Sequence, residues 1–372
     1  MKPPIRVGII GCGNVAAAYQ YHLQILIGQG LVEVSYVCDE DQDKAEQFSR
    51  KHHIPRFSGR FQDLIDSPHV DLILVLTSMH MHAEIARMGL LADKHVLVEK
   101  PIATGLEAAV ELLAVASSAS AYLLCAPFVA LSPTYQMIWL RVRRGDVGKV
   151  LTARARYGHA GPTWGGWYYR QGGGALFDLA PYNLTSLAGW LGAVKRVSAF
   201  AGTAIPERLV DGLRVQVEIE DNAHLLLDFG ASVYAVVTAG FTLQQYRCPA
   251  IELYGSEGTI QLMGDDWDPE GYELFQNTTG SWQIFKETDP GWLWTDGVQH
   301  LVNCILEGIK PIIRPEQAYH VLEILVRAKE SARDGQMKTI SSNFPPFDFS
   351  SRIFENEPIH LIHDRTHQRD VE

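Results

Sequence analysis

The sequence is poor in cysteine, in basic residues and in long apolar runs, and each shortage excludes a class of protein. Its five cysteines lie far apart with no CxxC pair, which is typical of reduced cysteines in a cytoplasmic protein. Acidic residues outnumber Lys and Arg by 43 to 32, giving a formal net charge of -11, which argues against nucleic acid or an acidic membrane surface as a partner. No apolar run approaches the length of a membrane span, and an apolar strand at residue 5 leaves no room for a signal peptide. We therefore expect a cytoplasmic protein that acts on a small molecule.

What the chain does contain is a change of pattern near Pro127. Up to residue 125, short β-branched runs alternate with helical stretches, which is typical of βαβ units and a parallel sheet. After Pro127, closely spaced alternating runs predict a largely antiparallel sheet. We expect an α/β protein with a doubly wound domain at 1–126, an α+β domain at 127–340 and an irregular tail at 341–372. Helices are expected at 133–144, 175–191, 295–307 and 315–334.

A glycine-rich turn opens the first domain and predicts a dinucleotide site. Gly11, Gly13 and Ala16 fit G-x-G-x-x-A between a strand and a helix, the arrangement of a Rossmann nucleotide-binding turn. Gly11 makes the tight turn, and Gly13 lets a pyrophosphate approach the backbone. The amides of the helix start, at Asn14 and Val15, then hold the phosphates. The alternative is a glycine turn that only packs.

Other residues at the ends of the predicted parallel strands are candidates for contact with the same cofactor. Asp39 ends the second strand, where a carboxylate accepts from the ribose hydroxyls and repels a 2'-phosphate, so NAD is favoured over NADP. Thr77 ends a later strand, and His80 and His82 follow it. Either histidine is expected beside the cofactor, although a capping or surface role is equally open for each.

Two further motifs predict the reacting groups. The strand 95–98 runs into Glu99, Lys100 and Pro101, which delivers a lysine to the carboxyl end of the sheet, where open α/β folds carry out chemistry. Glu99 is expected to order the lysine or a ribose. Asp178 and Tyr182 follow a glycine triplet and, being four residues apart, share one face of a helix. The structural alternatives are a surface lysine, a helix-start aspartate and a core tyrosine.

Together these motifs resemble the glucose-fructose oxidoreductase, inositol dehydrogenase and rhizopine-catabolism family, over roughly residues 5–335. The resemblance implies an N-terminal Rossmann domain, a C-terminal domain on a large mostly antiparallel sheet, and a sugar or polyol bound between them over a nicotinamide. It also implies a homodimer or homotetramer. Lys100 matches the family lysine and Asp178 the family aspartate. Tyr182 falls where many members carry a catalytic histidine, but glucose-fructose oxidoreductase and dimeric dihydrodiol dehydrogenases are similar in having tyrosine there.

The resemblance implies a hydride transfer that these residues assist. Tyr182, helped by Lys100, removes a hydroxyl proton while the carbinol hydride passes to NAD, and Asp178 orients the pair or grips a neighbouring hydroxyl. An aromatic loop at 157–171 provides a candidate sugar wall, because flat rings suit the faces of a pyranose. Its predicted substrate-binding residues are Trp164, Trp167, Tyr169 and Arg170, and a domain or subunit contact is the alternative use of this loop.

The leading hypothesis is therefore an NAD-dependent dehydrogenase acting on a secondary hydroxyl of a sugar, sugar derivative or glycoside, with NADP the less favoured cofactor. One alternative is a redox-neutral glycosidase that uses bound NAD for transient oxidation. A second is a non-catalytic dinucleotide-binding sensor. No metal site is expected, because His360, His363 and His367 match metal-ligand spacing only loosely and lack supporting ligands.

Overall fold

The computed structural model describes residues 3–286 and 292–349, which form two compact units. The first unit combines the described part of Met1–Phe128 with Leu293–Leu322, and the second combines Val129–Trp292 with the described residues from Glu323 onward. We had expected the segment 293–322 in the second domain; the structure groups it with the first. Of the predicted tail, residues 350–372 lie outside the described part, and so do the three tail histidines.

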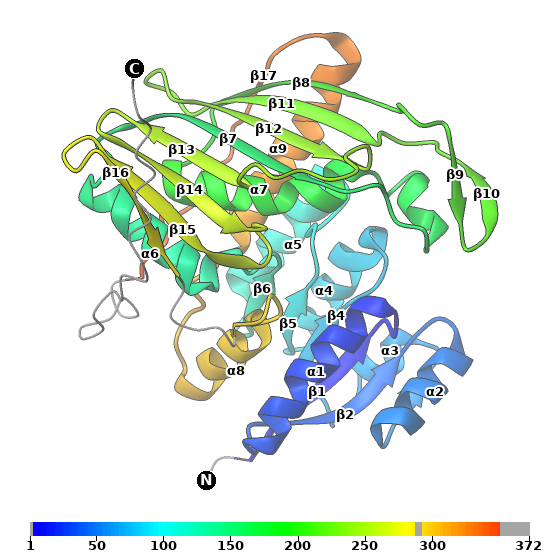
Figure 1. Ribbon diagram of the computed structural model, residues 1–372. Helices are drawn as coiled ribbons and strands as arrows, with labels where there is room; N and C mark the ends of the chain where they lie inside the picture. The colour runs from blue at the N-terminus through cyan, green and yellow to red at the C-terminus, as the bar shows by residue number, and fades with distance from the viewer. Residues whose placement is uncertain (1–2, 287–291, 350–372) are drawn as a thin grey trace. The chain divides into compact units, whose positions relative to one another are not determined.

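The first unit is built on a six-stranded parallel sheet (Figure 1), in the order β3-β2-β1-β4-β5-β6. Its central strand β4 is a fully buried apolar run, as expected for a parallel strand that is covered on both faces. The strand order reverses between β1 and β4, which is the position where open α/β sheets bind ligands. The predicted Rossmann sheet is confirmed. The strands are β1 (Ile5–Ile10), β2 (Val32–Cys38), β3 (Phe57–Ser58), β4 (Leu72–Val75), β5 (His95–Val98) and β6 (Leu123–Cys125).

Helices connect the strands of this sheet, and a late helix joins them. The connecting helices are α1 (Asn14–Gly28), α2 (Gln42–His52), α3 (Phe61–Ile65), η1 (Met79–Met81), α4 (His82–Leu91) and α5 (Leu106–Ser118). Helix α8 (Gly297–Glu307) also belongs to this unit: a Cβ at Gly297 would lie 2.5 Å from the ring of Phe128. Helix α9 (Pro315–Asp334) crosses the division between the units.

The second unit is built on a nine-stranded sheet, in the order β16-β15-β14-β13-β7-β12-β11-β8-β17. Its strand pairs are antiparallel except for β7 with β12, so the expectation of a mostly antiparallel sheet is confirmed. The strands are β7 (Val150–Gly158), β8 (Arg196–Gly202), β11 (Asn222–Asp228), β12 (Tyr234–Gly240), β13 (Ile251–Gly255), β14 (Gly258–Gly264), β15 (Pro269–Gln276), β16 (Ser281–Phe285) and β17 (Lys338–Thr339).

Helices lie against one face of this sheet (Figure 1), and a short hairpin stands apart from it. Helix α7 (Ala175–Leu191) packs on β7 and β12, and α6 (Pro133–Arg144) packs near α7 and β15. The short helices are η2 (Val129–Leu131) and η3 (Gly166–Tyr169). The hairpin consists of β9 (Glu207–Val210) and β10 (Leu213–Gln216). In β15, Pro269 and Gly271 interrupt the apolar alternation that indicates a strand in the sequence.

No helix in the described part of the chain is both long and apolar enough to span a membrane. Across residues 3–286 and 292–349, no group of three or more His, Cys, Asp or Glu side chains is placed to hold a metal ion.

Candidate active site

The glycine turn of the first unit has the geometry of a phosphate-binding loop. Gly11 has a φ of +102°, and a Cβ there would lie 2.5 Å from the carbonyl oxygen of Leu76, so only glycine fits without strain. Gly13 and Asn14 are exposed, and a Cβ built on Gly13 meets no atom within 4 Å. No side chain caps the start of α1. The first amides of α1, including those of Asn14 and Val15, therefore suit the phosphates of a dinucleotide.

Asp39 is fixed at the end of β2 by the same loop. Its Oδ2 accepts from the amide of Cys12 at 2.8 Å and its Oδ1 from the amide of Asp41 at 3.0 Å. Each carboxylate oxygen can accept a second hydrogen bond, so Asp39 retains capacity for a ribose hydroxyl. Burial raises the pKa of the Cys12 thiol to about 12, and the charge of Asp39 adds to this effect. The thiol is thus protonated near neutral pH and is not a nucleophile.

The segment after β4 separates the two candidate histidines. His80 is exposed on η1, whereas the side chain of His82 is buried, with 1% of its surface exposed. Both ring nitrogens of His82 are engaged: Nδ1 lies 2.7 Å from the carbonyl oxygen of Pro101, and Nε2 lies 2.9 Å from that of Thr77. The ring of His82 is therefore held by backbone carbonyls, and His80 is the more accessible of the two candidates for contact with a cofactor. Thr77 is partly exposed.

The turn that carries Lys100 is held by a buried carboxylate. Glu99 is buried, and its Oε1 accepts from the hydroxyl of Tyr19 on α1 at 2.7 Å. Its Oε2 accepts from the backbone amide of Lys100 at 3.1 Å. The Lys100–Pro101 peptide bond is cis. Glu99 thus orders the lysine turn, while Lys100 itself is partly exposed.

In the second unit, helix α7 leaves two adjacent positions open. From Ala175 to Trp190 every residue of this helix is buried except Asp178 and Tyr182. Because residues four apart lie on the same helix face, the two polar side chains form one accessible strip on an otherwise apolar helix.

A series of aromatic contacts extends from Tyr182 toward the predicted sugar wall. The rings of Tyr157 and Tyr182 meet edge to face with centroids 5.5 Å apart. The rings of Tyr157 and His159 are 6.4 Å apart, and the ring of Phe241 lies 5.3 Å beyond His159. Phe241 in turn contacts Tyr168 of the aromatic loop at 6.3 Å. The strand end and the loop are therefore joined by one continuous series of ring contacts, in which Phe241 and Tyr168 are buried.

Within the loop, the predicted residues divide into exposed and buried ones. Trp164 and Trp167 are 42% and 38% exposed, and Arg170 is also exposed. Tyr169 is 1% exposed, and its hydroxyl donates to the carbonyl oxygen of Pro162 at 2.6 Å. Tyr169 is therefore a packing residue rather than part of an accessible wall, in contrast to the sequence-based expectation.

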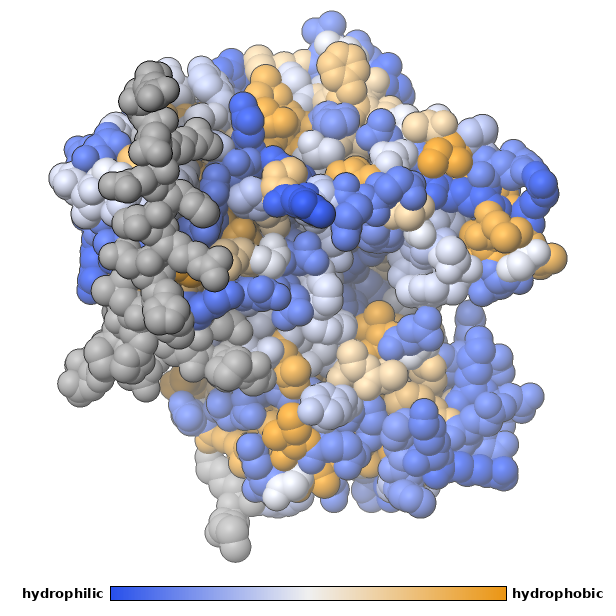
Figure 2. All heavy atoms as spheres, viewed as in Figure 1, coloured by the Kyte–Doolittle hydropathy of each residue, from blue (hydrophilic) through white to orange (hydrophobic). Residues whose placement is uncertain are grey.

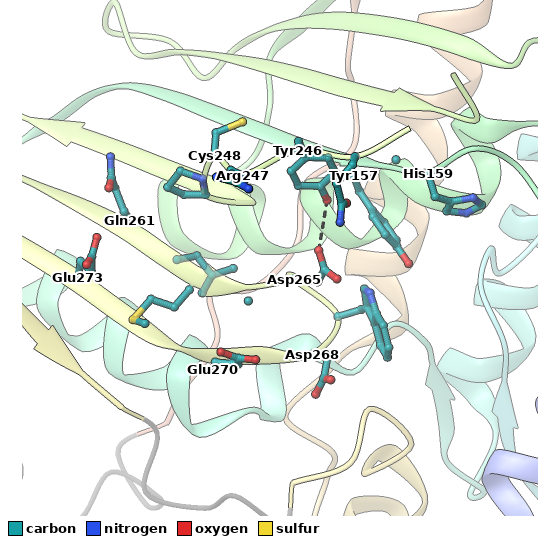
Figure 3. A pocket seen from close by; sticks show the side chains of 17 residues that line it. Tyr157, His159, Tyr246, Arg247, Cys248, Gln261, Asp265, Asp268, Glu270 and Glu273 are labelled. Carbon is teal, nitrogen blue, oxygen red and sulfur yellow. Dashed lines mark hydrogen bonds between the residues drawn. The ribbon is translucent and has the colours of Figure 1, made fainter. Parts of the chain in front are cut away.

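A pocket of about 720 Å³ begins at the strand end of this series of rings (Figure 3). Tyr157 and His159 lie at one end, and the carboxylates of Asp265, Asp268 and Glu270 line a side that the sequence analysis did not identify. The hydroxyl of Tyr246 donates to Asp265 at 3.2 Å across the pocket. The available signal was the run of acidic residues that directly follows the strand β14. Hydroxyl groups suit such a lining, because carboxylates accept hydrogen bonds from them.

Comparison with known proteins identifies both units. A family model described as "Oxidoreductase family, NAD-binding Rossmann fold" matches residues 5–126, and a model described as "GFO/IDH/MocA C-terminal domain" matches residues 135–261. Together the two models cover more than half of the chain.

Relatives and solved structures match along most of the chain. The trans-1,2-dihydrobenzene-1,2-diol dehydrogenase of Homo sapiens is 27% identical over 344 residues, covering 88% of this chain and 96% of that protein. The enzyme of the same name from Macaca fuscata fuscata is 26% identical, covering 87% and 96%. A structure of levoglucosan dehydrogenase in complex with NADH shares the fold, with a TM-score of 0.82, 19% identity and coverage of 91% of this chain and all of that one. The glycine turn, the two folds and these matches lead to one conclusion: the chain belongs to the glucose-fructose oxidoreductase, inositol dehydrogenase and rhizopine-catabolism (Gfo/Idh/MocA) family of NAD-binding oxidoreductases.

Proposed function

We propose that this chain is an NAD-dependent dehydrogenase that oxidises a secondary hydroxyl of a sugar, sugar derivative or glycoside. The observation that carries the proposal is helix α7, where the only open positions before its last residue are Asp178 and Tyr182. The exposed rings of Trp164 and Trp167 support a ring-shaped, hydroxyl-rich substrate, because aromatic faces pack on the C–H faces of sugars.

In this proposal two side chains act on the proton that is transferred, and a third orients the substrate. Tyr182 removes the proton of the substrate hydroxyl, and Lys100 stabilises the resulting phenolate by its positive charge. Asp178 accepts a hydrogen bond from a neighbouring substrate hydroxyl and so fixes which carbon reacts. NAD, when bound, accepts the hydride from the same carbon. In the reverse direction Tyr182 returns the proton to the alkoxide.

The preference for NAD over NADP rests on Asp39. Its carboxylate is held by the amides of Cys12 and Asp41 at the end of β2. A fixed negative charge at this place repels a 2'-phosphate, while it accepts from a 2'-hydroxyl.

The test is a substrate panel read by two signals at once. Purified protein is incubated with NAD or NADP and with monosaccharides, amino sugars, inositols and aryl glycosides, while reduced nicotinamide and product mass are followed. NADH formation with one sugar class supports the proposal. Glycoside cleavage without NADH would replace it with a redox-neutral glycosidase, and binding without turnover on any substrate would favour a sensor.

Variants then test the assigned residues. We expect Lys100→Met and Tyr182→Phe each to lower kcat by about 10² or more, the contribution typical of general acid-base catalysis. The matched controls are Lys51→Met and Tyr21→Phe, because both of these side chains are exposed on helices outside the assigned site. If Tyr182→Phe retained wild-type kcat, the proton would have to leave by another group.

We further propose that the second unit mediates self-association through the face of its sheet opposite α7. Phe200, Leu226 and Val236 are 83%, 51% and 44% exposed, and strand register puts them on one face of adjacent strands. Figure 2 shows apolar patches among polar ones at the top of the view, where the large sheet lies. Sedimentation of the wild type should reveal a dimer or tetramer that Leu226→Glu combined with Val236→Glu converts to a monomer. A monomeric wild type would contradict this assignment.

A further inference from the structure

His82 occupies an unusual position for a histidine that follows a cofactor-binding strand. It is the first residue of α4, its ring is buried, and it contacts two backbone carbonyls that are far apart in the sequence. One carbonyl belongs to Thr77, just after β4, and the other belongs to Pro101, directly after Lys100. The ring thus joins the end of one central strand to the turn that follows the next.

The chemistry of these contacts determines where the ring hydrogen lies. A carbonyl oxygen only accepts, so a ring nitrogen forms a hydrogen bond with it only when that nitrogen carries a hydrogen. Burial lowers the pKa of His82, and Lys100 acts in the same direction, while the two carbonyls and Glu99 oppose them. The neutral ring that follows from a lowered pKa has one hydrogen. We place that hydrogen on Nδ1, which makes the shorter contact, 2.7 Å to Pro101 against 2.9 Å from Nε2 to Thr77.

The position of Pro101 gives this contact its importance. On the amino side of the turn, Glu99 accepts from the amide of Lys100 and is itself held by Tyr19. On the carboxyl side, the hydrogen bond from His82 holds the carbonyl of Pro101. Lys100 therefore sits between two anchored peptide groups, and loss of either one frees its backbone. A displacement of about 1 Å in a reacting group can cost about 10² in rate.

We propose that His82 is a positioning residue, which donates from Nδ1 to the Pro101 carbonyl and thereby fixes the direction in which Lys100 presents its amine. The inference rests on the proposed function of Lys100.

Two amide variants separate the two contacts of the ring. Asparagine places its NH₂ where the histidine Nδ1 lies, and glutamine places its NH₂ where Nε2 lies. We expect His82→Asn to keep kcat within about threefold of the wild type, because the bond to Pro101 survives. We expect His82→Gln to lower kcat at least about tenfold, with the Kd for NAD changed less than threefold. Equal kcat values for the two variants, or a loss in His82→Gln that appears only in NAD affinity, would overturn the proposal.

Two measurements decide the question without turnover. The first is trace acetylation of Lys100 against pH, read by mass spectrometry, with the exposed Lys51 as internal reference. The titration midpoint of Lys100 should shift in His82→Gln and not in His82→Asn, and an unchanged midpoint in both contradicts the proposal.

The second measurement is the ¹⁵N imidazole spectrum of the wild type, which needs no variant to fold. A hydrogen on Nδ1 is expected, and a ring protonated only at Nε2 would overturn the assignment. If no substrate is found, the proposed function fails while these two measurements still test His82.

Discussion

Adding one methyl group to each of the two glycines of the nucleotide loop should affect different properties, stability at Gly11 and NAD binding at Gly13. At Gly11 the added Cβ of alanine would lie 2.5 Å from the carbonyl oxygen of Leu76 and 2.9 Å from the amide of Thr77, at a φ of +102°. At Gly13 the added Cβ meets no atom within 4 Å. The same substitution therefore tests folding at one position and cofactor binding at the other.

The magnitudes follow from this geometry. A positive φ at a non-glycine residue costs roughly 1–3 kcal/mol, and the backbone contact at Gly11 adds to it, so Gly11→Ala should lose about 3 kcal/mol or more of unfolding free energy. Gly13→Ala should lose at most about 1 kcal/mol, because alanine is only a poorer N-cap than glycine. If a pyrophosphate approaches Gly13, however, the methyl group displaces it, and we expect the Kd for NAD to rise at least about tenfold, or about 1.4 kcal/mol.

The assay pairs thermal unfolding with calorimetric titration of NAD. Each kcal/mol corresponds to about 2–4 °C in Tm for a unit of this size, so the Tm of Gly13→Ala should fall by no more than about 4 °C. Gly28→Ala is the matched control, because it adds a methyl group in open space at the far end of the same helix. Its Kd for NAD should equal that of the wild type. Wild-type NAD affinity in Gly13→Ala would refute the reasoning that the loop holds the cofactor phosphates.

Three further outcomes follow from the charges. Asp39→Asn should raise the Kd for NAD about tenfold and lower that for NADP, and parallel changes in both titrations would contradict its role. Asp221 is fully buried and pairs with Arg208 at 2.9 Å, so Asp221→Asn should cost about 3–5 kcal/mol in urea unfolding; a loss below 1 kcal/mol would count against it. Burial raises the pKa of Asp266 well above its usual value, aided by Asp265 and opposed by the hydrogen bond from Asn183. A carboxyl group whose pKa is higher in the folded than in the unfolded protein contributes its full stabilisation at a pH below its pKa in the unfolded protein. This contribution is lost as the pH rises through the pKa of the folded protein. The Tm of Asp266→Asn minus the Tm of the wild type should therefore increase from pH 5 to pH 8. A Tm difference that does not change with pH would contradict the ionisation of this buried carboxyl.

Local sequence predicted much of the fold because its signals extend over a few residues. The helices 133–144, 175–191 and 315–334 have the predicted bounds, since their apolar spacing and end residues are close together in the chain. The residues 255–258 likewise form a hairpin turn between the antiparallel strands β13 and β14, as glycines at both ends of a short polar segment favour. The strands β15 and β16 escaped prediction, because each is stabilised by pairing with a neighbour in the sheet, β15 with β14 and β16 with β15.

The candidate site was predictable as a set of motifs but not as a set of contacts. Glu99 and Tyr19 are 80 residues apart, and no pattern in either segment indicates that they share a hydrogen bond. Tyr169 has the composition of a sugar-binding residue, but its burial depends on how the loop folds back on Pro162. The acidic pocket side likewise arises where separate strands and loops meet.

The sequence by itself determined the glycine turn, the lysine after the fifth parallel strand and the shared helix face of Asp178 and Tyr182, because each depends only on local backbone geometry. The tertiary structure decided that Leu293–Leu322 joins the first unit, that the ring of His82 is engaged at both nitrogens, and that Asp178 and Tyr182 are the open positions of a buried helix. The physical reason is that burial and hydrogen-bond partners come from residues remote in the chain, and these meet only when the whole unit has packed.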